Sequence, residues 1–485
     1  MSEPIIERSN VGNNGDQDPD AAREFIVQVA RHVDGNGTIQ IRFDADEEDV
    51  DKQKSDGNEP QDSTEVVRRK EPKNPSQSVR LSKLSTNWTS TCIAFFEVVP
   101  KLTALNFEYA SNDLIERMAT YAKSVSSKVK EFDDGETKVT EYFISVEEFP
   151  IVATKFGRST HILQAAEVMG RSSLGALVSE YEAFIARLLE IFSTVIPTAF
   201  VTDEDQISIG DLAEFTSIDE AKKALLRKKI EDILHTKSHV EVLTWIGEKF
   251  KVNLLSDTEL LADFSEICQR RHLLTHAGGV VNRRYLTKCK QAGCDLSKLP
   301  GLDEKVSIDA KYLRRATARI FQVGFFTLHI LWQKLIPKDF DDSLSCILTT
   351  SHDFLENELT KMCRRVCDFA LGSTKKKSER TSAYLVINKA LSFKHDTELD
   401  PADRKKNLDL VLASRDWSIL SPTLELALAC VREDHSKLED LATSAANVGV
   451  NYMNANTWVV FRGVRDKPEF ISKFRRPRNV QIVVP

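Results

Sequence analysis

The sequence lacks several patterns that would place it in a familiar class at once. Its eight cysteines include no Cys-x-x-Cys pair, and there is no glycine-rich phosphate loop of the G-x-x-x-x-G-K-[ST] or G-x-G-x-x-G type. No run of about 20 mostly apolar residues would span a membrane. The N-terminus has no basic segment followed by an apolar one. We therefore expect a protein of the reducing cytosol, with no cofactor, no metal and no membrane partner.

Net charge also gives little indication of function in most of the chain. The 485 residues carry 66 basic and 73 acidic side chains, a net charge of −7. Residues 1–70 alone hold 17 acidic and 9 basic side chains, so the rest of the chain is close to neutral. A surface that binds nucleic acid must therefore be local, because the bulk charge does not favour it.

The N-terminal part is predicted to contain two regions. Residues 1–78 form an acidic arm with a β-hairpin or a short helix within 24–43, followed by a flexible linker that has almost no apolar residues. Residues 79–149 form a helical region. Within it, apolar residues at helical spacing predict a helix over 115–132, and an extended segment is predicted at 142–152.

The remainder of the chain predicts a mainly α protein. Residues 150–340 read as an antiparallel helical bundle, with helices at 172–196, 218–235, 239–250, 258–275 and 310–336. Residues 341–485 read as a C-terminal domain of stacked helices of the tetratricopeptide-repeat kind, with helices at 352–371, 382–393, 402–413, 423–432 and 437–448.

One segment, 264–286, concentrates side chains suited to acid–base chemistry. It ends a predicted helix with two arginines and two histidines, directly before Gly278-Gly279. Histidine transfers protons near neutral pH, and arginine offers a fork of donors to phosphate oxygens. Together they suit the cleavage of an RNA phosphodiester by its own 2′-hydroxyl, in which arginine stabilises charge on the phosphate.

The run Arg271-His272-Leu273-Leu274-Thr275-His276 resembles the Arg-polar-x-x-x-His signature of the HEPN superfamily. These are small helical bundles, and many are metal-independent ribonucleases of bacterial toxins and anti-phage systems. The resemblance covers about residues 150–337. It implies that Arg271 binds phosphate, that His276 is catalytic, and that His272 fills the polar position of the motif.

Further residues enter through the same resemblance. Asn282 and Tyr285 resemble the residues found after the motif in one branch of such bacterial proteins. Arg270 stays open as a rival to Arg271, because Arg270-x5-His276 also satisfies the family's looser spacing. Glu180 is a supporting candidate, with Glu182 and Arg187 on the same polar face, since HEPN bundles often turn a polar residue of the first helix toward the cleft. Its alternative role is an ordinary solvated charge.

The expected partners are RNA and a second copy of the chain. Residues five apart on a helix differ by about 140° around its axis, so Arg271 and His276 do not converge on one straight helix. HEPN nucleases are understood to join two domains in one composite cleft. The resemblance thus implies a homodimer or a higher even oligomer, and products with a 2′,3′-cyclic phosphate. A phage component or another protein acting as trigger would bind the C-terminal helices.

Two other interpretations compete with a nuclease. Cations at a helix C-terminus also complement the helix dipole, so this segment can be a purely structural helix end. The chain would then be a non-catalytic dimeric scaffold whose C-terminal helices bind a protein partner. The His-x3-His spacing of zinc proteases is not supported, because Leu273 stands where those enzymes have a glutamate base.

Overall fold

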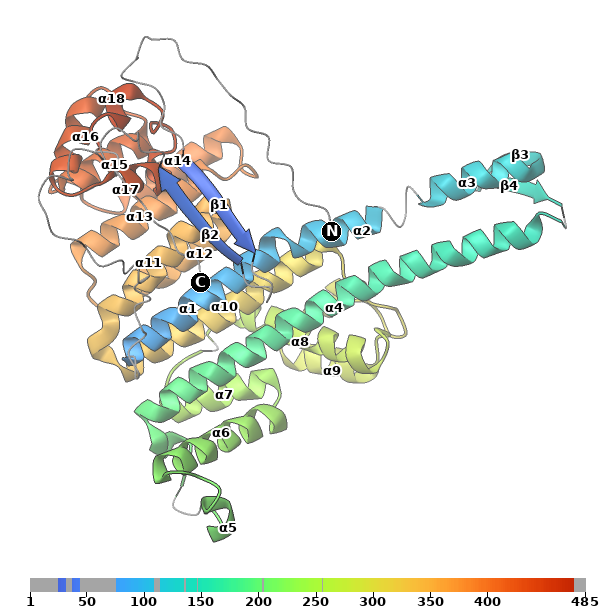
Figure 1. The fold of residues 1–485 in the computed structure, drawn as a ribbon, viewed down its shortest axis with the longest axis horizontal. Coiled ribbons are helices and arrows are strands. Elements are labelled where there is room, and N and C mark those ends of the chain that lie inside the picture. The colour runs from blue at the N-terminus through green and yellow to red at the C-terminus, as the bar shows by residue number, and fades with distance from the viewer. Residues whose placement is uncertain are drawn as a thin grey trace, which may run out of the picture. The chain divides into compact units, whose positions relative to one another are not determined.

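The computed structural model describes residues 25–31, 37–43, 76–108, 114–134, 137–145, 147–202, 205–254 and 256–474 (Figure 1). The protein is mainly α-helical, as predicted. The chain divides into two compact units, residues 70–419 and residues 1–69 together with 420–485. The boundaries predicted at residues 149 and 340 therefore lie inside the larger unit.

The N-terminal arm contains the predicted β-hairpin and not the alternative helix. Strands β1 (Phe25–Arg31) and β2 (Gly37–Phe43) pair antiparallel, with Val29 opposite Ile39. The Gly/Asn-rich sequence between them favours a turn, and the strands are rich in β-branched residues. The predicted linker runs from 44 to about 78, and the structure describes only its last residues, from 76, where a helix begins at Gln77. The basic end of the chain after residue 474 lies outside the described residues.

The helix predicted over 115–132 is too long. Helix α3 (Leu114–Val125) stops at Val125, and the next residues form strand β3 (Ser126–Asp134), which pairs with β4 (Thr137–Ile144). The sequence of β4, rich in threonine, valine and aromatic residues, favours a strand and recruits β3 as its partner. Pairing between strands has therefore overridden the helical spacing in the second half of the predicted helix.

The extended segment predicted at 142–152 is wrong beyond the end of β4. Helix α4 (Phe149–Val195) already begins there and runs through 47 residues, so it starts well before the predicted position 172. Pro150 lies in its first turn, where a missing N–H costs nothing, and opens the helix instead of ending a strand. In Figure 1, α3, β3 and β4 lie beside the N-terminal half of α4.

Most of the remaining bundle helices match their predictions to within one residue at each end. Their bounds are α6 (Ile218–Thr236), α7 (His239–Phe250), α8 (Thr258–His276) and α10 (Ala310–Leu335). The preceding and intervening helices are α1 (Gln77–Glu97), α2 (Val99–Glu108), α5 (Ile209–Leu212) and α9 (Arg283–Gln291). Short 3-10 turns cover Pro197–Ala199, Leu296–Lys298, Pro337–Asp339 and Val459–Phe461.

Helix α10 lies at the centre of the larger unit and packs against α1, α4 and α8 (Figure 1). Gly324 permits the closest approach, because a Cβ there would lie 2.9 Å from Nε1 of Trp88. The Trp88 indole stacks on Phe184 of α4 with ring centroids 4.6 Å apart. Its Nε1 donates a hydrogen bond to the Phe321 carbonyl oxygen of α10. Three helices therefore share one aromatic core.

His329 is a polar residue within the largely apolar helix α10, and both of its ring nitrogens have partners inside the protein. Nδ1 of His329 lies 2.9 Å from the Ser343 hydroxyl, and Nε2 lies 3.2 Å from the Ser85 hydroxyl. Burial lowers the pKa of His329 to about 3, so this imidazole is a neutral structural group. None of the helices described here is both long and apolar enough to cross a membrane.

The helix predicted over 352–371 is in fact two helices. They are α11 (Phe340–Glu356) and α12 (Thr360–Gly372), and Glu358 between them has a left-handed backbone with φ of 59°. The later helices follow the prediction more closely: α13 (Glu379–Lys394), α14 (Pro401–Ala413), α15 (Pro422–Arg432) and α16 (Leu438–Asn447). Two short helices, α17 (Tyr452–Thr457) and α18 (Pro468–Ile471), complete the smaller unit.

Candidate active site

The two glycines after α8 fix where the helix ends. Gly278 and Gly279 have φ values of 60° and 86°, a region that other residues adopt at a cost. The N–H of Gly279 returns to the Leu273 carbonyl, and the N–H of Val281 donates to the Glu304 carbonyl at 2.8 Å. These hydrogen bonds fix the backbone at the C-terminal turn of α8, and so the positions from which its last side chains extend.

His272 and His276 lie side by side at this end of α8. Their ring centroids are 4.5 Å apart and both side chains are exposed. They border a small hollow of about 130 Å³, whose other polar lining residues are Gln269, Asn282 and Arg284. Leu273, Ala277 and Tyr285 supply the apolar part of its wall. The imidazole rings of His272 and His276 and the guanidinium of Arg284 therefore line the same hollow.

The environment of His272 favours the neutral form of its imidazole. Partial burial lowers the pKa of His272, and the neighbouring His276, Arg284 and Arg271 lower it further. A neutral imidazole is able to accept a proton, which is the property that a general base needs.

Arg271 turns away from the hollow toward α4. Its guanidinium pairs with the carboxylate of Glu182, and the same carboxylate oxygen lies 2.9 Å from Nε2 of His239, at the start of α7. Burial raises the pKa of Glu182, but His239 and Arg271 outweigh it, so the pKa falls below its ordinary value. Burial lowers the pKa of His239, yet Cys268 and Glu182 raise it overall to about 10.

Arg270 belongs to a buried network on the other side of α8. Its Nε donates to Glu266 at 2.6 Å, and the hydroxyls of Tyr285 and Tyr312 each donate to the same carboxylate at 2.8 Å. The guanidinium also lies 4.2 Å from the centre of the Tyr312 ring. This network joins α8, α9 and α10, and Arg270 is too enclosed to reach a ligand.

Only some of the site residues predicted from the sequence line the hollow. His272, His276, Asn282 and Tyr285 line one hollow, whereas Arg270 and Arg271 do not. Asn282 also caps α9, because its Oδ1 accepts the N–H of Tyr285 at 2.9 Å. Glu180 is exposed on α4 and does not line the hollow.

Two functional candidates were not predicted as site residues. Arg284 lines the hollow, and His239 binds the carboxylate of Glu182, which in turn binds Arg271. Arg284 was detectable in principle, because recognising Asn282 as a helix cap places Arg284 in the first turn of α9. The role of His239 depends on how α4, α7 and α8 pack, and no local sequence pattern indicates it.

Residues that could ligate a metal lie elsewhere. In the part of the chain that the structure describes, one group of three such side chains has its ligand atoms within 4.8 Å of one another: His352, Asp353 and Glu356 on α11. None of the three lines the hollow beside His276.

Comparisons with known proteins do not place the chain in a family. No family model matches it, and searches of curated proteins and of solved structures give no match either.

Proposed function

We propose that this protein is a metal-independent endoribonuclease of the HEPN type, acting in the bacterial cytoplasm as a toxin or an abortive-infection effector. The observation that carries the proposal is the exposed pair His272 and His276, whose rings lie 4.5 Å apart beside Asn282 and Arg284. Such a pair combines a proton acceptor with a proton donor next to a permanent cation.

The proposed reaction needs only these groups and the RNA itself. A neutral imidazole takes the proton from a 2′-hydroxyl, and that oxygen attacks the adjacent phosphorus. The bond from phosphorus to the 5′-oxygen breaks, and the leaving oxygen receives a proton from a charged imidazole. The products are a 2′,3′-cyclic phosphate and a 5′-hydroxyl. Arg284 is available to stabilise charge on the phosphate oxygens.

In this proposal Arg271 exchanges its carboxylate partner for a phosphate of the RNA. Its partner Glu182 is half-exposed, with 41% of the side chain accessible, so a phosphate can replace that carboxylate. We propose that a second copy of the chain places its own α8 end opposite the first. The hollow of one protomer, about 130 Å³, is small for a nucleotide, and a dimer would complete it.

A second candidate has one observation in its favour. Arg271 is already paired with Glu182, and the cations in the last turns of α8 complement the helix dipole. A non-catalytic dimeric scaffold, with protein partners at the C-terminal helices, would use the same residues for stability alone.

Cleavage of RNA in the presence of EDTA tests the proposal. We expect His276→Ala to slow cleavage by about 10²–10⁴-fold, because a general acid or base contributes about that much. Arg271→Ala is expected to weaken it as well. The matched control is His235→Ala, which removes an exposed histidine from the last turn of α6 and should leave cleavage unchanged.

Two results would overturn the assignment. Equal cleavage by the wild type, His276→Ala and Arg271→Ala would place the activity elsewhere or in a contaminant. No cleavage of total cellular RNA by a folded, dimeric wild-type protein would favour the scaffold. Growth arrest on overexpression, relieved by His276→Ala and retained by His235→Ala, would support the nuclease in the cell.

A further inference from the structure

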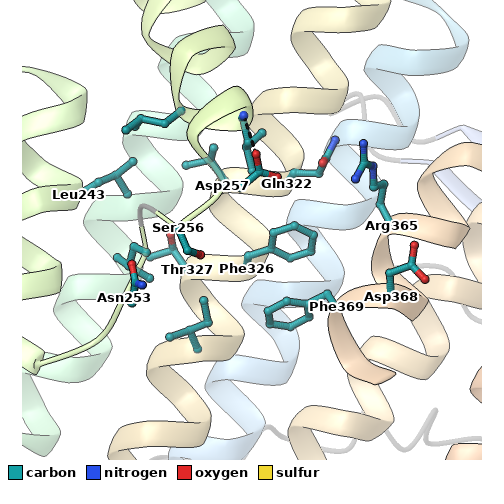
Figure 2. A pocket seen from close by; sticks show the side chains of 15 residues that line it. Leu243, Asn253, Ser256, Asp257, Gln322, Phe326, Thr327, Arg365, Asp368 and Phe369 are labelled. Atoms are coloured by element: carbon teal, nitrogen blue, oxygen red, sulfur yellow. Dashed lines mark hydrogen bonds between the residues drawn. The ribbon is translucent and has the colours of Figure 1, made fainter. Parts of the chain in front are cut away.

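The larger unit contains a second and larger pocket, about 270 Å³ in volume, away from the histidine pair. It lies between the segment that joins α7 to α8, the middle of α10 and the second half of α12 (Figure 2). Ligand pockets in proteins are usually about 300–1,000 Å³, so this one suits a small molecule. No residue of this pocket lines the hollow beside His276.

Most of the pocket wall is apolar. The rings of Phe326 and Phe369 are stacked with centroids 4.4 Å apart, and both side chains are only partly buried. Leu243, Leu261 and Ile330, from α7, α8 and α10, extend this apolar surface. A large apolar group on a ligand would cover the wall and release the water in contact with it.

Polar side chains lie together at one edge of the pocket. Figure 2 shows Asp257, Gln322 and Arg365 there, with Gln322 between the other two. Asp257 is the N-cap of α8, and its Oδ1 accepts the N–H of Leu260 at 2.9 Å. This hydrogen bond leaves the negative charge of the carboxylate in place. The edge therefore offers an anion and a cation, separated by a carboxamide.

The charges around the pocket balance. Asp368, the other acid of the lining, pairs with Lys389 at 2.7 Å. Asp257 and Arg365 are both exposed, and neither forms an ion pair with a residue in the described part of the chain. A ligand that complements this edge has one positive and one negative group close together, and no net charge.

Gln322 also lacks a partner for one of its polar atoms. The residue is deeply buried, with only 3% of its surface exposed. Its Nε2 donates to the Ala318 carbonyl at 2.9 Å, which fixes the amide, but no residue that the structure describes donates a hydrogen bond to its Oε1. Because an unpaired buried acceptor costs free energy, this oxygen indicates a donor on the ligand. An ammonium group beside Asp257 is such a donor.

We propose that this pocket binds a free α-amino acid with a large apolar side chain, such as leucine or phenylalanine. An α-amino acid carries its ammonium and carboxylate groups on one carbon, so both groups reach the same edge. The ammonium group lies between Asp257 and Oε1 of Gln322, and the carboxylate binds Arg365. The side chain lies against Phe326 and Phe369. The terminal residue of a peptide keeps only one of the two charged groups, which favours the free amino acid.

Isothermal titration calorimetry of the full-length protein with matched ligands tests this assignment. Phenethylamine is phenylalanine without the carboxylate, and we expect it to bind about 5-fold more weakly, because the lost contact is with the exposed Arg365. 3-Phenylpropionate lacks the ammonium group and should lose about 10-fold or more, because Gln322 then stays without a donor. L-Alanine should bind about 10- to 100-fold more weakly than L-phenylalanine, because it leaves the apolar wall uncovered.

Two variants test the charged contacts one at a time. Arg365→Ala should weaken L-phenylalanine by about 5-fold without weakening phenethylamine, which has no carboxylate. Asp257→Asn keeps a side chain that caps α8 and removes the charge, so it should weaken L-phenylalanine without weakening 3-phenylpropionate. The control is Arg314→Ala, which removes an exposed arginine of α10 outside the pocket and should bind L-phenylalanine as the wild type does.

Several outcomes would overturn the proposal. Absence of binding by both L-phenylalanine and L-leucine at millimolar concentration would exclude an amino-acid site. Equal affinities for L-phenylalanine, phenethylamine and 3-phenylpropionate would exclude the two charged contacts. Equal weakening of L-phenylalanine and 3-phenylpropionate by Asp257→Asn would exclude the ammonium contact. None of these measurements involves RNA, so their failure would leave the proposed nuclease unaffected.

Discussion

Arg270 and Arg271 are neighbours in α8, yet each pairs with a glutamate in a different environment. Arg270 binds Glu266 of the same helix, whose side chain is only 3% exposed. Arg271 binds Glu182 of α4, whose side chain is 41% exposed. Two adjacent, chemically identical cations therefore differ in the solvent around their partners and in the helices that they connect.

Because of this difference, Arg270 suits a structural role and Arg271 suits ligand binding. Glu266 accepts hydrogen bonds from Arg270, Tyr285 and Tyr312, and separating Arg270 from it would leave the buried Arg270 charge without its carboxylate. A pair at the surface is worth about 0–1 kcal/mol, so Arg271 can leave Glu182 at small cost. Of the two arginines, only Arg271 is free enough to meet a phosphate.

Replacing the two glutamates gives the largest expected contrast. Glu266→Ala should lower the free energy of unfolding by about 3–5 kcal/mol, because it leaves Arg270 buried and unpaired. Glu182→Ala should lower it by less, because this carboxylate is 41% exposed and solvent screens its pairs with Arg271 and His239. Urea denaturation of both variants measures the two values. If both changes cost the same, the network around Glu266 does not hold α8, α9 and α10 together.

Replacing single hydroxyl groups gives a smaller contrast within the core. Tyr285→Phe removes one donor to the Glu266 carboxylate and should cost about 1.5–3 kcal/mol. Tyr181→Phe is the matched control: Tyr181 is equally buried, but its hydroxyl has no hydrogen-bond partner among the described residues, so its loss should be neutral or stabilising. Equal destabilisation in urea would show that both hydroxyls act only through packing.

The sequence predicted what depends on local patterns and missed what depends on packing. Helices α7 and α10 could be located because apolar residues recur in them at helical spacing, and both begin after a side chain that caps the helix, Ser238 or Asp309. The end of α8 was located because Gly278 and Gly279 terminate it. The strand β3 was missed because its partner, and not its own spacing, decides its conformation.

The candidate site shows the same division. The spacing of His272 and His276 by four residues correctly predicts that the two rings share a face. The choice between Arg270 and Arg271 could not be made from spacing, because both lie one turn or more before His276. The choice depends on the partners Glu266 and Glu182. The packing of α4 and α10 against α8 decides which face of α8 is buried.

A third contrast concerns how the stability of the pair on the Arg271 side depends on pH. The pKa of His239 is raised to about 10 in the folded protein, against about 6.5 when unfolded. A raised pKa contributes stability that is complete below about pH 6.5 and declines as the pH rises toward about 10. Glu182, whose pKa is lowered, contributes above its ordinary value and loses this contribution in acid.

Glu182→Gln should therefore reduce the dependence of stability on pH between about 6.5 and 10, because it removes the carboxylate that helps to keep His239 charged. Cys268, Tyr181 and Arg271 face the same imidazole and remain in both proteins, so the difference between wild type and variant isolates Glu182. Urea titrations at pH 6, 8 and 9.5 measure it. Parallel pH profiles would mean that Glu182 does not keep His239 charged. Only the greater solvent exposure of Glu182 would then distinguish the Arg271 pair from the Arg270 pair.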